Sequence, residues 1–374
     1  MGKMEENLKI LHIDTQKGWR GGQQQAIYLH SFLNREAITS LMLCQPESEM
    51  AKKCLENHLP YKTLNMRHEF DLKAVFDMIR FIDQQGFQVI HCHCAHSLAL
   101  GVLVKFFRRK LVLIGARRVD FPIKKNPFSR FKYSSSLVDK IVCISENIRQ
   151  VMIKCQIDES KLELIHSGVD IHKYEDLRHL EVPEELRNYY QKKKIIGTVA
   201  ALVGHKDYTT LLKAARLILA DREDCIFIAL GDGRDKDNLL KLKSNLGLDE
   251  RFIFAGYHSN VKDYLACFDL FVLASKLEGL GTSVLDAMSA GIPVVACASG
   301  GIPEMISHQV NGLLAETENP QDLAIQIHYA LNHAEEMNQF AVRSKKVLTT
   351  FSIENTTQKN LDLYRKLIAR DKPV

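Results

Sequence analysis

The sequence predicts an α/β protein with two domains, each built from a parallel β-sheet with helices on both faces. Three observations lead to this prediction. Short apolar runs typical of buried strands alternate with helical patterns, which favours parallel sheets covered by helices. The alternation runs through the first half of the chain and restarts after a polar, charged stretch at residues 171–193. At 374 residues, the chain is long enough to give each domain its own hydrophobic core.

The first strand–helix series predicts an amino-terminal domain over residues 1–175. Its strands are expected at residues 8–14, 40–44, 89–92, 112–115 and 140–144. A helix at residues 23–33 follows the first strand, and helical patterns separate the others. Because ligands bind doubly wound sheets at the carboxyl ends of the strands, function is expected in the loops that follow these strands.

The second series predicts a carboxy-terminal domain over residues 176–350. Its strands are expected at residues 195–200, 226–230, 252–255, 270–274 and 293–297. Its helices are expected at residues 208–220, 236–246, 261–267 and 282–290. A last amphipathic helix is expected at residues 352–369, within a tail of residues 351–374.

The composition is that of a soluble globular protein, with 46% hydrophobic and 25% charged residues. No apolar stretch approaches the length of a membrane span. The first residues carry acids and lack the apolar core of a secretory signal. Nine cysteines without such a signal fit reduced, buried thiols better than a disulfide framework. We therefore expect a cytoplasmic protein.

The segment at residues 275–288, S-K-L-E-G-L-G-T-S-V-L-D-A-M, carries the strongest functional signal. It follows an apolar strand, and its glycines, among them Gly281, permit a tight turn and a close approach to a ligand. Thr282 or Ser283 is expected to cap the helix that follows. The free N–H groups at the start of that helix form a site for phosphate.

Two carboxylates flank this helix start, Glu278 on the loop and Asp286 one helical turn inside the helix. A phosphate site between two acids suits a sugar nucleotide, with hydroxyls bound by the carboxylates. Glu278 is separated from the acid Asp286 by seven residues, and the stretches A-M-S-A-G-I-P-V-V-A and S-G-G-I-P-E follow. This pattern resembles the signature of the retaining glycosyltransferases of family 4, which have the GT-B fold. In that family the second acid is usually Glu, and here it is Asp286. The resemblance extends, more weakly, over nearly the whole chain.

The resemblance implies two Rossmann-like domains that face a cleft, with the last helix crossing back to the first domain. It implies transfer from a nucleotide-diphosphate sugar, with a UDP-sugar as the expected donor. Glu278 would hold the donor sugar, Asp286 would hold the ribose, and the amides of Gly281, Thr282 and Ser283 would carry the diphosphate. Because no other carboxylate is an obvious nucleophile, the resemblance implies front-face transfer.

Lys206 follows the first strand of the second domain and is expected to neutralise the diphosphate as it leaves. The family resembled usually pairs this lysine with an arginine a few residues earlier, where this chain has Ala201. One cation is therefore missing from the pattern. The candidates to replace it are His205, Arg234, Arg117 and Arg118.

Four further residues are expected at the site because of their places in the loops. Gly22 opens the first helix in a loop that lies over the diphosphate and the acceptor in the family resembled, although a plain tight turn is the alternative. Gly231 lies at a strand–turn junction, and Tyr257 lies near the nucleotide base by resemblance. His96, near a strand end, is expected to contact the transferred sugar, with a structural histidine as the alternative. Neither first loop contains G-x-G-x-x-G or a P-loop, which argues against a dehydrogenase or a P-loop kinase.

The run H-C-H-C-A-H at residues 91–96 invites interpretation as a metal site. Successive side chains on a strand point to opposite faces, so adjacent His and Cys cannot converge on one ion. No second pair at zinc-finger spacing accompanies the run. Since Lys206 and helix starts are available for the phosphates, no required metal or cofactor is expected.

Basic residues gather between Lys105 and Lys132, opposed by Asp120 alone, and phenylalanines lie among them. Basic residues mixed with aromatic ones suit an anionic membrane surface. A solvated basic face is the alternative, and no recognised module supports nucleic-acid binding. Together with A-R-R-V-D-F-P at residues 116–122, the stretch resembles transferases of bacterial lipopolysaccharide core or other lipid-linked glycans. We therefore expect a glycan or lipid-linked acceptor, and an enzyme that can lie on the inner face of the plasma membrane.

Two other functions remain open. A non-hydrolysing sugar-nucleotide epimerase shares the architecture and the donor type, and it needs no acceptor. A non-catalytic sugar-nucleotide-binding protein would bind the donor without turnover.

Overall fold

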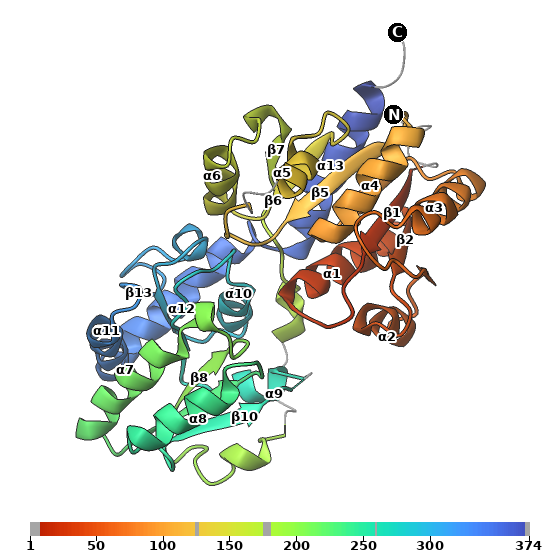
Figure 1. The fold of residues 1–374 in the computed structure, drawn as a ribbon. Coiled ribbons are helices and arrows are strands. Elements are labelled where there is room, and N and C mark those ends of the chain that lie inside the picture. Colours follow the sequence, from red (N-terminus) through yellow and green to blue (C-terminus); the bar gives the residue numbers. More distant parts are fainter. Residues whose placement is uncertain (1–7, 124–126, 175–180, 259, 371–374) are drawn as a thin grey trace. The chain divides into compact units, whose positions relative to one another are not determined.

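The computed structural model describes residues 8–123, 127–174, 181–258 and 260–370. The chain forms two compact units. The first consists of the chain up to Gly168 and the segment from Ile353 onward, and the second runs from Val169 to Ser352. Each unit has a parallel sheet with helices packed against it, so the predicted α/β fold class is confirmed (Figure 1).

The sheet of the first unit has seven parallel strands in the order β3-β2-β1-β4-β5-β6-β7. Its interior strand β1 has apolar side chains buried on both faces, as a sheet covered by helices requires. The strands are β1 (Lys9–Asp14), β2 (Thr39–Cys44), β3 (Tyr61–Thr63), β4 (Val89–Cys92), β5 (Val112–Arg117), β6 (Lys140–Cys143) and β7 (Leu162–Leu164). The helices are α1 (Gly21–Arg35), α2 (Glu49–Glu56), α3 (Leu72–Gln85), α4 (Ala95–Phe107), α5 (Pro127–Ser134), α6 (Glu146–Lys154) and the 3-10 turn η1 (Glu159–Lys161).

The sheet of the second unit has six parallel strands in the order β10-β9-β8-β11-β12-β13. Strand β9 is buried along its whole length. The strands are β8 (Lys194–Val199), β9 (Cys225–Leu230), β10 (Phe252–Gly256), β11 (Leu270–Leu273), β12 (Val294–Cys297) and β13 (Leu313–Ala315). The helices are α7 (Tyr208–Asp221), α8 (Lys236–Asn245), α9 (Lys262–Leu265), α10 (Thr282–Ser289), α11 (Pro320–Asn332) and α12 (Ala334–Leu348). The 3-10 turns are η2 (Ile171–Tyr174), η3 (Glu184–Leu186), η4 (Gly204–Lys206) and η5 (Ile302–Glu304).

Each strand predicted from an apolar run is present, with ends within two residues of the expected ones. The strands that were not predicted, β3, β7 and β13, have three residues each, too few for a periodic pattern to stand out. Helices α11 and α12 were also not predicted. Helix α11 packs against β11, β12 and β13, and α12 packs against α10 and α11. Leu323, Ile327 and Phe340 of these helices belong to the hydrophobic core of the second unit.

Helix α13 (Ile353–Arg370) returns the chain to the first unit, where it packs beside α1 and β5 (Figure 1). Leu361, Tyr364 and Leu367 share a hydrophobic cluster with Ile10 of β1 and Val89 of β4. None of the helices in the described ranges combines the length and the apolar character needed to cross a lipid bilayer.

Candidate functional site

Lys206 and Glu278 form an ion pair at the carboxyl edge of the second unit's sheet. Lys206 ends η4, which follows β8, and Glu278 lies on the loop after the neighbouring strand β11. Both side chains are largely buried, with 17% and 12% exposed. The Ser275 hydroxyl donates to Oε2 of Glu278 at 3.1 Å, and the backbone N–H of Lys276 donates to the His205 carbonyl at 3.0 Å. These contacts tie the two loops together.

Two glycines of the S-G-G-I-P-E stretch support the backbone of Glu278. The N–H of Gly301 donates to the Glu278 carbonyl at 3.2 Å. Gly300 has φ +53°, and a Cβ at this position would lie 1.6 Å from the same carbonyl oxygen. Only glycine allows this close approach, so the second motif holds the first in place.

Helix α10 begins at Thr282 with Gly281 as its N-cap, and Gly281 has φ +90°. The expectation that Thr282 or Ser283 caps the helix was therefore wrong, because both residues lie within its first turn. Glycine offers no capping side chain, and the first N–H groups of a helix have no acceptor within it. The helix start thus keeps donors for an anion. A Cβ at position 281 would lie 2.4 Å from Cδ1 of Ile302, so the turn also needs a glycine for space.

Asp286 has a partner that the sequence did not reveal. The Tyr174 hydroxyl, on η2, donates to Oδ1 of Asp286 at 3.0 Å. Burial raises the pKa of the Asp286 carboxyl, and Lys173 and the hydrogen bond from Tyr174 oppose that rise. Tyr174 lies in the polar, charged stretch at residues 171–193 between the two strand–helix series, so no local signal pointed to it.

The other candidates of the second unit lie in the loops after β8, β9 and β10. At Gly231, which has φ +144°, a Cβ would lie 2.0 Å from the Ala200 carbonyl oxygen, so this glycine is needed for contact with the β8 loop. Tyr257 follows β10 and is 62% exposed. Ala201 is exposed, and the side chain of Arg234 is 81% exposed with Asp235 at 3.8 Å.

Polar groups also gather at the carboxyl edge of the first unit's sheet. Asp14, which ends β1, accepts hydrogen bonds from Gln16 N at 2.7 Å and from Gln23 Nε2 at 3.0 Å. Gly22, in the first turn of α1, faces Arg118, since a Cβ there would lie 3.3 Å from Arg118 Cδ. The expected site glycine thus makes room for an arginine.

Beneath these groups, His12, His91 and His93 form a buried histidine cluster. His91 and His93 are alternate residues on the same face, and His12 on β1 is the register partner of His91. Nδ1 of His12 lies 2.8 Å from Nε2 of His93, and Nδ1 of His91 lies 2.7 Å from the Tyr364 hydroxyl of α13. Burial lowers the pKa of all three histidines, that of His91 to about 3, so the rings are neutral at pH 7.

Nitrogens of the three rings lie within 4.8 Å of one another, a spacing at which a metal ion could be held. The sequence argument considered only adjacent His and Cys residues. The cluster instead combines the alternate residues His91 and His93 with His12 of the neighbouring strand β1. Arg118 Nη2 donates to Nδ1 of His93 at 3.1 Å. Since arginine cannot accept, the His93 proton lies on Nε2 and is donated to His12. Both nitrogens of His93 are therefore engaged, and a cation touches its ring, which disfavours a second cation at the cluster.

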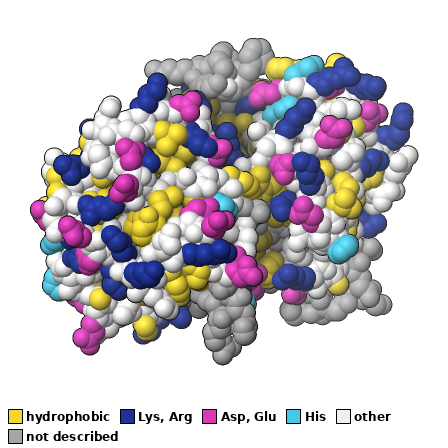
Figure 2. All heavy atoms as spheres, turned by 90° about the horizontal axis from the view of Figure 1, so that it is seen from below, with side chains coloured by type: hydrophobic (Ala, Val, Ile, Leu, Met, Phe, Trp, Pro, Cys, Tyr) yellow, Lys and Arg dark blue, Asp and Glu magenta, His cyan; other side chains and the backbone are white. Residues whose placement is uncertain are grey.

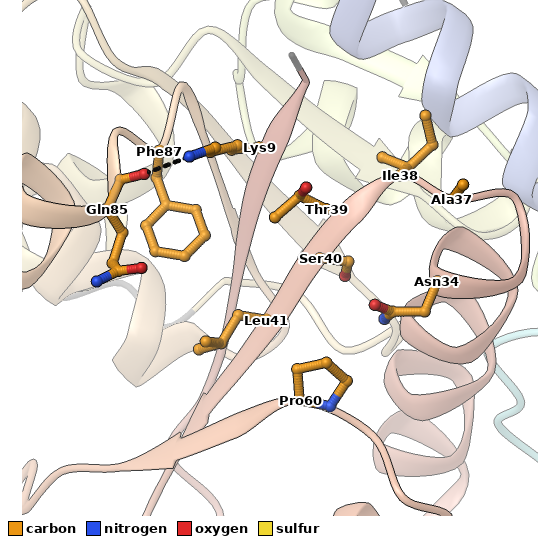
Figure 3. Close-up of a pocket in the computed structure, with 10 residues that line it drawn as sticks. All are labelled: Lys9, Asn34, Ala37, Ile38, Thr39, Ser40, Leu41, Pro60, Gln85 and Phe87. Atoms are coloured by element: carbon orange, nitrogen blue, oxygen red, sulfur yellow. Dashed lines mark hydrogen bonds between the residues drawn. The ribbon is translucent and has the colours of Figure 1, made fainter. Parts of the chain in front are cut away.

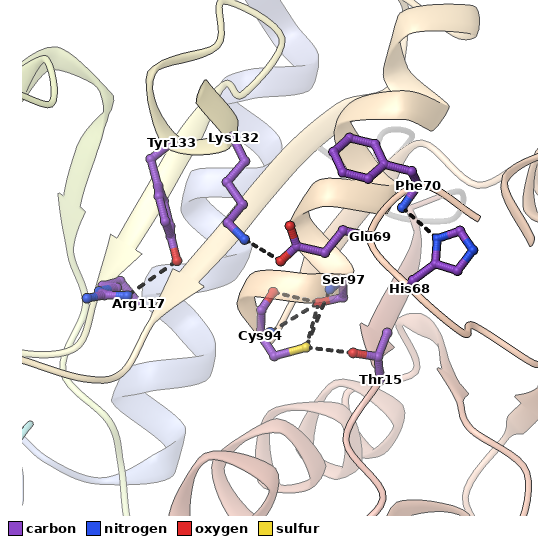
Figure 4. A network of polar contacts seen from close by, with 9 residues as sticks. All are labelled: Thr15, His68, Glu69, Phe70, Cys94, Ser97, Arg117, Lys132 and Tyr133. Carbon is purple, nitrogen blue, oxygen red and sulfur yellow. Dashed lines mark hydrogen bonds and ion pairs between the residues drawn. The ribbon is translucent and has the colours of Figure 1, made fainter. Parts of the chain in front are cut away.

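His96 lies in the first turn of α4, between the N-cap Cys94 and Ser97 in sequence, and Figure 4 shows these two residues. It is partly buried, and its Nε2 has no hydrogen-bond partner among the described residues. In that network Cys94 caps α4, and its Sγ lies 3.1 Å from Thr15 Oγ1. His96 and Thr15 therefore follow neighbouring strands of the first unit's sheet.

The basic stretch between Lys105 and Lys132 does not form one basic surface. Lys105 and Lys132 are buried and paired with Asp139 and Glu69, and Figure 4 shows the second pair. Arg117 and Arg118 also turn inward, Arg117 to the hydroxyl of Tyr133 and the carbonyl of Phe121. Arg109, Lys110 and Arg130 remain exposed, whereas Lys124 and Lys125 lie outside the described residues. On the face presented in Figure 2, basic and acidic side chains are interspersed.

Two surface pockets lie away from these residues. The pocket in Figure 3 is lined by Lys9 and Thr39, which begin β1 and β2, and by neighbouring residues. A second pocket is lined by Lys194 and Ile195 at the start of β8. Both lie at the amino ends of strands, the edge opposite the candidate residues, and neither includes any of them.

Both halves of the chain match models of known families. Residues 19–173 match the model described as Glycosyltransferase Family 4, and residues 184–347 match Glycosyl transferases group 1. Over 385 aligned positions the chain is 20% identical to the UDP-Gal:alpha-D-GlcNAc-diphosphoundecaprenol alpha-1,3-galactosyltransferase of Escherichia coli, covering 98% of this chain and 99% of that protein.

Two further relatives are similar over different extents. The lipopolysaccharide core biosynthesis glycosyltransferase LpsE of Rhizobium meliloti is 30% identical over 176 residues, which are 47% of this chain and 49% of LpsE. The crystal structure of HepE from Anabaena in complex with UDP superposes with a TM-score of 0.82 at 18% identity, covering 96% of this chain and all of that one. At this identity the likeness to HepE shows the fold.

Proposed function

Because the chain is a glycosyltransferase of GT-B type, we propose that it is a retaining enzyme that transfers a sugar from a nucleotide-diphosphate sugar to a glycan or lipid-linked acceptor. The acceptor belongs to bacterial lipopolysaccharide or another surface glycan. The observation that carries the proposal is the buried ion pair of Lys206 and Glu278, which lies on loops beside the uncapped start of α10.

Each group of this site has a role in the proposed reaction. The amides of Gly281, Thr282 and Ser283 bind the diphosphate, and Lys206 neutralises the negative charge that grows as the diphosphate leaves. Glu278 accepts hydrogen bonds from the hydroxyls of the donor sugar. Lys206 has three N–H donors, so it can contact a phosphate while it still positions Glu278.

Asp286 binds the ribose hydroxyls through Oδ2, since Oδ1 accepts from Tyr174. This tether compensates for a side chain one methylene shorter than the usual glutamate. Tyr257, exposed after β10, is proposed to lie against the nucleotide base. Gly231 keeps the adjoining loops of β8 and β9 together, and Gly22 and His96 belong to the acceptor side of the site.

The proposed donor is a UDP-sugar. The E. coli relative is named for UDP-Gal, and HepE was crystallised with UDP, which supports this base. Transfer proceeds on the front face: the bond from the sugar to the diphosphate breaks, and the acceptor oxygen attaches on the same face. The acceptor proton passes to a phosphate oxygen of the donor. The diphosphate is held by Lys206 and helix amides, so no metal is required.

The proposed acceptor and location rest on two relatives and one surface. The E. coli relative is named for a lipid-linked acceptor, and LpsE for lipopolysaccharide core synthesis. In the first unit, Leu72 and Phe76 of α3 and Phe106 and Phe107 of α4 are each at least 45% exposed, and α3 packs against α4. Exposed basic residues, Lys73, Arg80, Arg109 and Lys110, belong to these helices or follow them. We propose that this surface, rather than the whole basic stretch, contacts an anionic membrane on its cytoplasmic side.

The proposal is tested with a panel of UDP-, GDP- and ADP-sugars. The thermal unfolding temperature is expected to rise with one UDP-sugar, because a ligand that binds the folded state stabilises it by mass action. Incubation with that donor and no acceptor then separates the alternatives, since an epimerase converts the sugar alone. Turnover only with a lipid-linked or glycan acceptor, unchanged after EDTA treatment, is the expected result. Stabilisation without any turnover would indicate a binding protein instead.

A further inference from the structure

Arg118 is a positively charged group that feels the Asp14 carboxylate at longer range but contacts no carboxylate of the described residues. It directly follows β5 at the carboxyl edge of the first unit's sheet, and no acidic side chain in the described ranges forms an ion pair with it. Its Nε is buried without a hydrogen-bond partner. Burial lowers the pKa of Arg118 to about 10, so the guanidinium stays charged at pH 7.

A buried guanidinium without an ion pair lowers the stability of the folded chain. A desolvated charge without a counter-ion destabilises a fold, and buried charges are normally paired. Lys105 and Lys132 of the same unit illustrate the usual solution, since both are buried and form ion pairs with Asp139 and Glu69. The hydrogen-bond partners of Arg118 among the described residues are neutral, and Asp14 acts on its charge only at longer range. The guanidinium can therefore bind a further anion that is not part of the chain.

The surroundings hold Arg118 in one orientation. Its Nη2 donates to His93, whose other nitrogen donates to His12, and both rings are buried among β1 and β4. Gly22 lies against its Cδ. Among the described residues, the other terminal nitrogen, Nη1, makes only a 3.5 Å contact with Ser167 Oγ, and the side chain is partly exposed. Nη1 therefore has N–H groups to offer to a ligand.

We propose that Arg118 binds a phosphate group of a substrate, and that His93, backed by His12, is the positioning residue that aims its guanidinium. A guanidinium bound on one side by a neutral acceptor presents its other N–H groups in a fixed plane, which suits phosphate oxygens. The identity of the phosphate rests on the proposed function: it belongs either to the donor diphosphate or to a phosphate-bearing acceptor.

The test measures binding of inorganic pyrophosphate and of UDP by calorimetry to the full chain and to its variants. Arg118→Gln removes the charge, Arg118→Lys keeps it, and Arg109→Gln makes the same change in net charge at an exposed arginine. Wild type is expected to bind pyrophosphate, and Arg118→Gln is expected to weaken it about ten- to hundredfold, the loss typical of one charged hydrogen bond. Arg118→Lys should recover part of that loss, and Arg109→Gln should match wild type.

His93 is tested by a pair of variants that differ in one property. His93→Asn keeps an acceptor for Nη2, whereas His93→Leu does not, and thermal unfolding confirms that each variant folds. We expect His93→Leu to weaken pyrophosphate binding nearly as much as Arg118→Gln, and His93→Asn to restore much of it. Equal binding by both folded variants would contradict the positioning role.

The two sources of phosphate give different patterns. A weaker affinity of Arg118→Gln for UDP as well as pyrophosphate identifies the donor, and an unchanged affinity for UDP with a raised acceptor KM identifies the acceptor. Pyrophosphate binding that is the same in Arg118→Gln and wild type overturns the inference, whatever the enzyme transfers. Conversely, a wild type that binds pyrophosphate through Arg118 but no nucleotide sugar contradicts only the proposed function.

Discussion

Tyr174 donates a hydrogen bond to Asp286 across 3.0 Å, joining η2 to helix α10. The contact connects the start of the second unit's chain to the helix whose amino end is the proposed phosphate site. It keeps a carboxylate of raised pKa in one orientation and favours its charged form.

Tyr174→Phe is expected to weaken UDP binding most at low pH. Without the hydrogen bond the pKa of Asp286 rises further, so the carboxylate is protonated, and stops accepting from the ribose hydroxyls, at a higher pH than in wild type. Calorimetric affinities for UDP between pH 5 and 8 measure the shift. Tyr329→Phe, which removes a tyrosine–carboxylate hydrogen bond to Glu336 on the surface of the same unit, is the matched control. Parallel pH profiles for wild type and Tyr174→Phe would contradict the role of the pair.

Lys206→Ala and Glu278→Ala are each expected to abolish transfer while the fold survives. Each removes a group proposed to bind the donor, and removal of one such electrostatic interaction typically costs a hundredfold or more in rate. The control is Lys276→Ala, which removes an exposed ion pair with Glu318 from the same loop. Transfer rates and circular dichroism spectra are measured together. Near-normal turnover in both site variants would count against the proposed function.

Gly300→Ala is expected to reduce both stability and activity, because a Cβ there collides with the Glu278 carbonyl. Gly247→Ala is the control, since Gly247 also has positive φ, +67°, but has open space around its Cβ position. The control measures the cost of placing alanine at a positive φ without a steric clash, which is about 1 kcal/mol of folding stability. Thermal unfolding and kcat should show a larger loss for Gly300→Ala in both quantities. Equal losses of stability and kcat in the two variants would mean that Gly300 is needed only for its positive φ and not for its contact with Glu278.

Acid is expected to destabilise the first unit before the second. His12, His30, His91 and His93 are buried, and burial lowers their pKa values, that of His30 to about 4. Their unfolded pKa is about 6.5, so below that pH the unfolded chain binds more protons than the folded one. Stability is therefore complete above pH 6.5 and falls as the pH drops, by up to about 1.4 kcal/mol per histidine for each pH unit.

Hydrogen exchange at pH 7 and pH 5 measures this effect within one molecule. Amides of β1 and β4 should lose protection at pH 5, while those of β8 and β9 in the second unit serve as the internal control. Equal loss of protection in both sheets would contradict a role of the histidines.

Much of the architecture is determined locally. Apolar runs long enough to bury both faces of a strand, as in β1 and β9, predict their own positions because burial alone explains such runs. The short strands β3, β7 and β13 carry too few residues for a pattern, and their pairing partners define them. Glu278, Lys206 and Gly281 could be proposed as site residues from the sequence because each follows a predicted strand, and the carboxyl ends of parallel strands meet at one edge of the sheet.

The two parallel-sheet units, their longer strands and the loops that carry the acid pair and the lysine follow from the sequence alone. The contacts between distant side chains are visible only in the folded chain: Tyr174 with Asp286, Gly300 with Glu278, and His93 with both Arg118 and His12. The basic residues between Lys105 and Lys132 do not share one surface in the folded chain. Successive residues of a strand point to opposite faces, and Lys105 and Lys132 turn inward to pair with acids. Periodic burial is a property of a single segment, whereas contact and charge pairing depend on residues far apart in the chain.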